Sequence, residues 1–355
     1  MSASEEHGHG QEAFRAPLLL HSLSVFAEVI LPCLDIVGAR TLVEVGSEEG
    51  TFTRNLVTWV ERAGGTLYCV DPEPSEKLVE LCDTSDAVRL VRGYSPRALE
   101  ALEKADAYVI DGDHNYYTVS GELEVIERQS RDDGGVPLVF VHDIGWPCGR
   151  RDQYYSPESL PPEALHPYTY ERGVRPGCNE AVEGGFRSGG EFAVATEEGG
   201  ERNGVLTAVE DFLRDRDDLA LAKVPCVFGL GVIHRTSSPE GKSLGEFLEA
   251  YDGHALLERM EANRLDLYLN VLDLQDVIND MGDSLLRLRD VTTENRALWA
   301  RNAELEAHLE LLTDEASNLL DSRAFALAER LATLRGSSAL SRDRLRAVLE
   351  REQPV

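Results

Sequence analysis

The chain has 355 residues, of which 42% are hydrophobic, so it is long enough for one large domain with an appendage or for two domains. Its 64 acidic and 35 basic residues give a net charge of −29, which repels phosphate backbones and anionic lipid. We therefore exclude nucleic acid and membrane surfaces as partners and expect a small molecule or another protein. The six cysteines form no CxxC pair and no apolar run is long enough to span a bilayer, which predicts a cytoplasmic protein.

Residues 1–39 are predicted to be a helical or disordered lead-in. The opening stretch "MSASEEHGHGQEAF" is acidic and polar, which is typical of a disordered end. The apolar part of "APLLLHSLSVF" is too short and wrongly flanked for a signal peptide.

From residue 40 to 240, apolar β-type runs alternate with helical patterns, which predicts one domain. Strands that are apolar throughout and alternate with helices are typical of a parallel sheet covered on both faces. Two further β runs, 219–224 and 227–235, are joined closely enough to form an antiparallel pair. We predict an α/β, Rossmann-like, doubly wound sheet of seven mostly parallel strands with an antiparallel last strand. Its first five strands cover 41–45, 66–71, 88–91, 107–111 and 137–143.

Residues 145–200 interrupt this alternation and are rich in proline, glycine and aromatic side chains. The segment is too long for an ordinary connection, and disordered segments usually contain few aromatics. We therefore predict a substrate lid inserted into the domain.

Residues 241–355 contain little glycine or proline and much leucine, glutamate and arginine. From Ile278 to Leu288, apolar residues recur at alternating spacings of four and three, which is a heptad pattern. After a register shift at Val291 the seam continues, with Asn295 and Asn302 on it, where asparagine can fix register. This predicts a C-terminal α-helical coiled coil for self-association, and the rival interpretation is a helix packed on its own domain.

The stretch "VEVGSEEG" lies directly after the first strand and before a helix. Gly46 and Gly50 would let a ligand lie against the backbone, and the helix N-terminus adds N–H donors. The second strand ends in Asp71, placed to accept both hydroxyls of a ribose. A tight turn capped by Ser47 or Glu48 would also explain the glycines, but with Asp71 the pattern favours nucleoside binding.

These motifs and the final "LALAKVPCVFGLGVIH" resemble the class I S-adenosylmethionine-dependent methyltransferases over about residues 20 to 235. The resemblance implies S-adenosyl-L-methionine as cofactor, with its methionine end on the loop after the first strand and its adenine near the "RGYS" turn. The cofactor-binding residues that it implies are Glu44, Gly46, Ser47, Gly50, Asp71, Tyr94, Ser95 and Asp111.

The stretch "DAYVIDGDHNYYTV" places Asp111 at the end of the fourth strand and His114 three residues later. The fifth strand ends in His142 and Asp143. Carboxyl ends of neighbouring parallel strands face one crevice, so Asp111, His142 and Asp143 are expected to converge. Two carboxylates and an imidazole suit Mg²⁺ or Mn²⁺. Asp-Gly-Asp is also a frequent turn, and a His-Asp pair can be merely a cap.

Within this family, the "IDGDH" stretch most resembles the metal-dependent O-methyltransferases of natural-product pathways, which act on macrolide sugars and related scaffolds. This resemblance implies Asp111, His142 and Asp143 as metal ligands and His114 as the catalytic base. His142 departs from the pattern, since relatives usually carry a carboxylate there. His142 is therefore a second candidate for the base, in a site without metal.

The expected reaction is methylation of a hydroxyl on a small natural-product or sugar-bearing metabolite. Aromatic side chains with a few polar groups suit such an acceptor. One alternative is a metal-independent N- or C-methyltransferase, and another is a non-catalytic coiled-coil assembly protein with a vestigial methyltransferase domain. The lid residues expected to contact the acceptor are Trp146, Arg150, Tyr154 and Tyr155.

Overall fold

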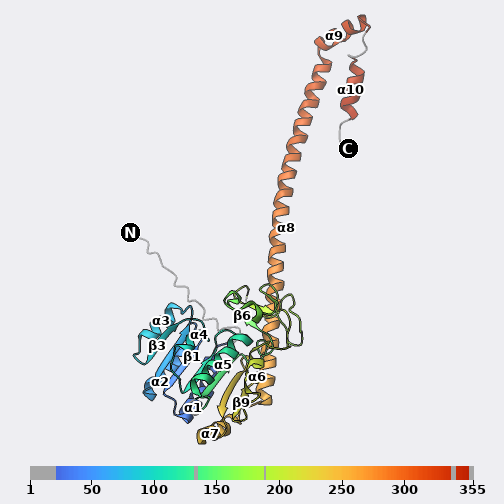
Figure 1. Ribbon diagram of the computed structural model, residues 1–355. Coiled ribbons are helices and arrows are strands. Elements are labelled where there is room, and N and C mark those ends of the chain that lie inside the picture. Colours follow the sequence, from blue (N-terminus) through green and yellow to red (C-terminus); the bar gives the residue numbers. More distant parts are fainter. Residues whose placement is uncertain (1–20, 132–134, 188, 337–340, 352–355) are drawn as a thin grey trace, which may run out of the picture. The chain divides into compact units, whose positions relative to one another are not determined.

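The computed structural model describes residues 21–131, 135–187, 189–336 and 341–351 (Figure 1). Its main sheet has seven strands in the order β3-β2-β1-β4-β5-β10-β9. Strands β1 to β5 pair in parallel, and β10 runs antiparallel to both its neighbours. The predicted Rossmann-like, mostly parallel sheet with an antiparallel strand is therefore confirmed. The strands are β1 (Thr41–Val45), β2 (Thr66–Asp71), β3 (Val88–Arg92), β4 (Ala107–Ile110), β5 (Leu138–His142), β9 (Leu219–Val224) and β10 (Leu230–Arg235).

Helices cover both faces of this sheet, because successive strand residues point to opposite sides. Leu42 on β1 belongs to one apolar cluster and Val43 to the other. The first cluster includes side chains of η1 (Leu23–Phe26), α1 (Ala27–Val37), α2 (Thr53–Ala63), α3 (Glu76–Asp83) and α7 (Pro239–Leu248). The second includes side chains of α4 (Arg97–Glu100), α5 (Tyr116–Ser130) and α6 (Val205–Leu213).

The segment predicted as a lid folds around a small antiparallel sheet in the order β6-β8-β7. The Arg151 side chain is buried in it and donates to the carbonyl oxygens of Ala195 at 2.6 Å and Asn179 at 2.7 Å. These bonds hold the segment together from within. Its elements are β6 (Gln153–Tyr154), η2 (Pro157–Ser159), η3 (Pro162–Ala164), β7 (Tyr168–Thr169) and β8 (Ala193–Ala195).

The C-terminal region is helical, with α8 (Ala255–Asp321), α9 (Arg323–Leu334) and α10 (Arg342–Arg351). The chain divides into two compact units between Asp276 and Val277, within α8. In the first unit, Leu265 and Leu269 of α8 are buried. The long helix agrees with the prediction, while the coiled coil stays a prediction. Among the described residues, no helix is long and apolar enough to cross a membrane.

Candidate active site

The ends of β4 and β5 meet at one edge of the sheet because the two strands are parallel neighbours. Ile110 lies opposite Val141 in the register, so Asp111 and His142 emerge side by side. Asp143 follows with a φ of +59°, a left-handed conformation that few non-glycine residues adopt. The convergence that strand order predicts is therefore present.

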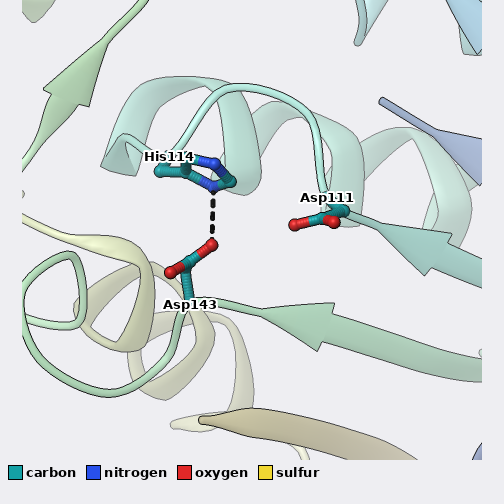
Figure 2. Close-up of side chains that lie close together, drawn as sticks. All are labelled: Asp111, His114 and Asp143. Atoms are coloured by element: carbon teal, nitrogen blue, oxygen red, sulfur yellow. Dashed lines mark ion pairs between the residues drawn. The ribbon is translucent and has the colours of Figure 1, made fainter. Parts of the chain in front are cut away.

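Asp111, His114 and Asp143 face one another (Figure 2). His114 Nδ1 lies 3.3 Å from Asp143 Oδ2, and each of the three residues offers one ligand atom within 4.8 Å of the others. His114 is placed there by the start of α5, where the Asn115 side chain accepts from Thr118 N at 2.9 Å. Two carboxylates and an imidazole at this spacing form a set that can hold a divalent cation.

His142 lies buried beside the same carboxylates, and both of its ring nitrogens make polar contacts. Its Nδ1 is 2.8 Å from Asp111 Oδ1 and 3.1 Å from Asp143 Oδ2. Its Nε2 is 3.0 Å from the carbonyl oxygen of Val227, which can only accept, so Nε2 carries a proton. Burial lowers the pKa of His142, but the carboxylates of Asp143 and Asp111 outweigh it and raise that pKa well above its ordinary value. The His142 side chain is 2% exposed, and its Nδ1 faces the two carboxylates.

The loop after β1 brings Gly46 against the end of β4. A methyl group on Gly46 would lie 2.1 Å from the carbonyl oxygen of Asp111, and the φ of Gly46 is +82°, so only glycine fits. Glu44 lies buried and accepts from Ser47 Oγ at 2.8 Å and Thr53 Oγ1 at 2.7 Å. Burial raises the pKa of Glu44 to about 7, against the effect of these two hydroxyls. Glu44 thus shapes the loop through Ser47.

The Asp71 carboxylate at the end of β2 accepts hydrogen bonds from backbone amides of two different turns. Its Oδ2 accepts from Glu48 N and its Oδ1 from Glu73 N, both at 2.9 Å. Gly50, with a φ of +76°, donates its N–H to Ser47 O at 2.7 Å. Each oxygen of Asp71 has a second acceptor position, so the predicted contact with a ribose is compatible with these bonds.

The turn after β3 lies next to a buried acid that the sequence analysis did not single out. Tyr94 is exposed, and the Ser95 hydroxyl donates to Glu122 Oε1 on α5. Glu122 is completely buried, and its Oε2 has no hydrogen-bond partner in the described part of the chain. Burial raises the pKa of Glu122 to about 8. The available signal was the helical spacing that places Glu122 on the buried face of α5.

We expect Glu122→Gln to flatten the dependence of stability on pH. A carboxyl whose pKa is about 4.5 unfolded and about 8 folded holds its proton in the native state, so it stabilises fully below pH 4.5 and loses that contribution as pH rises to 8. Glutamine is a neutral substitute, so the midpoint of thermal unfolding should fall less between pH 5 and 9 than in the wild type. Glu124→Gln, on the exposed side of the same helix, should behave as the wild type. Parallel melting curves for Glu122→Gln and wild type at all pH values would contradict this.

The predicted substrate contacts divide into two groups. Tyr154 is buried and donates its hydroxyl to Asp152 Oδ2 at 2.9 Å, and Arg150 pairs with a carboxylate of α6 at 2.6 Å. Both side chains are engaged within the protein. Tyr155 is 50% exposed, and its ring centroid is 5.8 Å from that of His114, so it lies beside the cluster.

Trp146 lines an apolar cavity of about 340 Å³ between the end of β5, the β9–β10 turn and α8. Its ring packs against Phe186 with centroids 5.8 Å apart. Phe228, Leu265 and Glu261 also line this cavity. Glu261 was not predicted as a site residue, because residues 241–355 were assigned to the coiled-coil region.

Residues 43–144 match the model of a family described as a methyltransferase domain. Solved structures of similar fold include an S-adenosylhomocysteine-bound methyltransferase from Podospora anserina, 13% identical, with a TM-score of 0.35 over 59% of this chain and 77% of that one. Another is 1,6-didemethyltoxoflavin-N1-methyltransferase from Burkholderia thailandensis, 13% identical, with a TM-score of 0.35 over 60% and 77%. Human N-acetylserotonin methyltransferase with S-adenosylmethionine is 15% identical, with a TM-score of 0.33 over 60% and 52%. No curated protein sequence matches the chain.

The structural likenesses are too distant to carry an argument about acceptor or reaction. The family match covers β1 to β5 and ends just after Asp143, so it contains both the glycine loop and the cluster at the strand ends. Residues 43–144 of the chain are therefore similar to a methyltransferase domain.

Proposed function

We propose that this protein is an S-adenosylmethionine-dependent methyltransferase, and that it transfers the methyl group to a hydroxyl of a small natural-product or sugar-bearing metabolite with the help of a divalent cation. The observation that supports this is the cluster of Asp111, His114 and Asp143, which adjoins the loop of Gly46. An ion held there would lie next to the site expected for the reactive end of the cofactor.

The distances between donor atoms fit such an ion. Neighbouring ligands of an octahedral cation with bonds of about 2.1 Å are about 3.0 Å apart. Asp143 Oδ2 lies 3.3 Å from His114 Nδ1, close to this spacing, and one ligand atom from each of Asp111, His114 and Asp143 lies within 4.8 Å of the others. We infer that Asp111, Asp143 and His114 hold the cation, so that His114 is a ligand and not the base, and His142 donates to the two carboxylates and is not a ligand. Imidazole together with carboxylate favours Mn²⁺ over Mg²⁺.

Each group then has a separate task. The cation, when bound, would supply the Lewis acidity that lowers the pKa of an acceptor hydroxyl, whose proton passes to solvent as its oxygen takes the methyl group from the cofactor sulfonium. His142, fixed by the carbonyl oxygen of Val227, keeps Asp111 and Asp143 in position. The loop of Gly46 and Gly50 places the methionine part of the cofactor, and Tyr155 beside His114 offers an aromatic surface to the acceptor.

A second candidate is metal-independent transfer, favoured by the contact between His114 Nδ1 and Asp143 Oδ2. A carboxylate that fixes one imidazole nitrogen leaves the other to take a proton, as in an Asp-His pair. In that case His114 is the base, and the protonated His142 neutralises Asp111 without any ion.

Removal of the metal separates these two functions. We expect isothermal titration to show S-adenosylmethionine binding, and Mn²⁺ to bind once per chain. Methyl transfer to an accepted hydroxyl substrate should be lost in EDTA and restored by Mn²⁺. A transfer rate that is unchanged after complete chelation would leave only the metal-independent function. If cofactor does not bind at all, a vestigial domain would be the remaining interpretation.

We further propose that the protein self-associates through the seam on α8. Leu298, Leu305, Leu312 and Leu319 recur every seven residues and are 46–65% exposed. A row of leucines at this spacing is the buried position of a coiled coil. The partner that fits it is the same seam of a second copy.

A further inference from the structure

We propose that Glu261 on α8 is a positioning residue of the active site, acting through the β9–β10 turn and His142. The proposal rests on the metal-assisted function inferred above. Glu261 lies in the part of α8 that belongs to the first compact unit, and this unit also contains the residues inferred to hold the cation.

The turn between β9 and β10 has an unusual backbone. Val227 and Phe228 have φ values of +46° and +64°, and Gly229 follows at +85°. The apolar run predicts a strand from residue 227, but the strand starts at Leu230 because of this turn. A β-branched or aromatic residue stays at positive φ only where its surroundings hold it.

The Glu261 carboxylate holds the turn from one side. Its Oε2 accepts from Val227 N and its Oε1 from Phe228 N, both at 2.9 Å. Arg264 donates to the same two oxygens at 2.7 and 2.6 Å, and its guanidinium lies 4.8 Å from the centroid of the Phe228 ring. Burial would raise the pKa of Glu261, but Arg264 and the two amides keep it below its ordinary value, so the carboxylate is ionised.

The carbonyl oxygens of the turn accept hydrogen bonds from residues at and after the end of β5. Val227 O accepts from His142 Nε2 at 3.0 Å, and Phe228 O accepts from Gly145 N at 2.6 Å. A methyl group on Gly145 would lie 2.5 Å from Phe228 O, so the two segments are in close contact. If the turn relaxes, His142 loses the acceptor that fixes its ring, and Asp111 and Asp143 lose the ring that orients them.

The simpler role for Glu261 is to attach α8 to the domain. The two roles differ in what a glutamine at this position would do. The amide of Glu261→Gln keeps one acceptor oxygen and turns its NH₂ toward a backbone N–H, so one of the two anchors is lost. Leu265 and Leu269 still pack, so the helix stays attached.

The experiment compares Glu261→Gln with Glu258→Gln in the full-length protein. Glu258 lines the same cavity one turn earlier on α8, so the two variants remove the same charge from the same surface. We expect Mn²⁺ affinity, measured by electron paramagnetic resonance, to fall about tenfold to hundredfold in Glu261→Gln, as for other groups that orient metal ligands. Glu258→Gln should bind Mn²⁺ as the wild type does.

A second readout is independent of any metal. The Nε2 proton of His142, assigned in ¹⁵N-histidine spectra with a His142→Gln variant, should exchange with water faster in Glu261→Gln. Adding Val227→Gly to Glu261→Gln should restore slow exchange and Mn²⁺ affinity, because glycine adopts positive φ without an anchor. A role in helix attachment alone predicts no such restoration.

The proposal is overturned if Glu261→Gln leaves the exchange of the His142 proton unchanged, or if Glu258→Gln alters it equally. It is also overturned if Val227→Gly does not restore that slow exchange. Absence of Mn²⁺ binding in the wild type would refute the metal site instead, and the histidine spectra would still decide the role of Glu261.

Discussion

Asp111→Asn should abolish measurable Mn²⁺ binding and lower methyl transfer by about 1,000-fold or more. The substitution removes a negatively charged ligand. In the wild type the protonated Nδ1 of His142 lies 2.8 Å from Asp111 Oδ1, and in the variant it would face a neutral amide instead. A cation in such a site contributes several kcal/mol to the transition state, which corresponds to a rate factor of about 1,000. Affinity for Mn²⁺ and for S-adenosylmethionine can be measured by isothermal titration before any acceptor is known.

Asp113→Asn is the matched control for this variant. Asp113 lies in the same loop, but its carboxylate accepts from Asn115 Nδ2 at 2.6 Å and Tyr155 N at 3.2 Å and is outside the cluster. We expect Asp113→Asn to retain Mn²⁺ binding. If Asp111→Asn binds Mn²⁺ as tightly as Asp113→Asn does, Asp111 is not a ligand.

Two aspartates on the seam of α8 should convert a self-associated protein into a monomer. Leu305 and Leu312 lie on the seam and are 46% and 65% exposed, so in a coiled coil their replacement by aspartate would bury charges without partners. We expect light scattering to show the mass of one chain, 39.2 kDa, for Leu305→Asp with Leu312→Asp.

The control for the seam is a second pair of leucines on the same helix. Leu286 and Leu311 lie off the seam and are 51% and 59% exposed. Their replacement by aspartate introduces the same charges and should leave the association state of the wild type unchanged. A wild-type protein that is already a monomer, or an equal loss of association in both pairs, would contradict the seam assignment. Cofactor binding should persist in both variants.

The sheet could be predicted from the sequence because each strand is recognisable from its own residues. Continuous apolar runs such as those before Asp111 and Asp143 are typical of strands buried on both faces, and the rule that parallel strands end at one edge brought these residues together. The position of His114 depends on a short loop and on the Asn115 cap, so its contact with Asp143 is visible only in the structure.

Long-range contacts account for what the sequence analysis assigned differently or missed. The stretch at Val227 looks like a strand, and only Glu261 on a distant helix explains why it turns. Tyr154 looks like a lid aromatic, but Asp152 accepts its hydroxyl within the protein. Periodicity reports which face of an element is apolar, and it carries no information about a partner far along the chain.

The central claim, a divalent cation between the ends of β4 and β5, is tested most directly by anomalous diffraction at the manganese absorption edge. The crystal should contain the full-length protein with S-adenosylhomocysteine and Mn²⁺. We predict one strong peak about 2.1 Å from oxygens of Asp111 and Asp143, with His114 Nδ1 completing the protein ligands. Clear density for the cofactor, with no anomalous peak at these carboxylates, would contradict the metal-assisted mechanism.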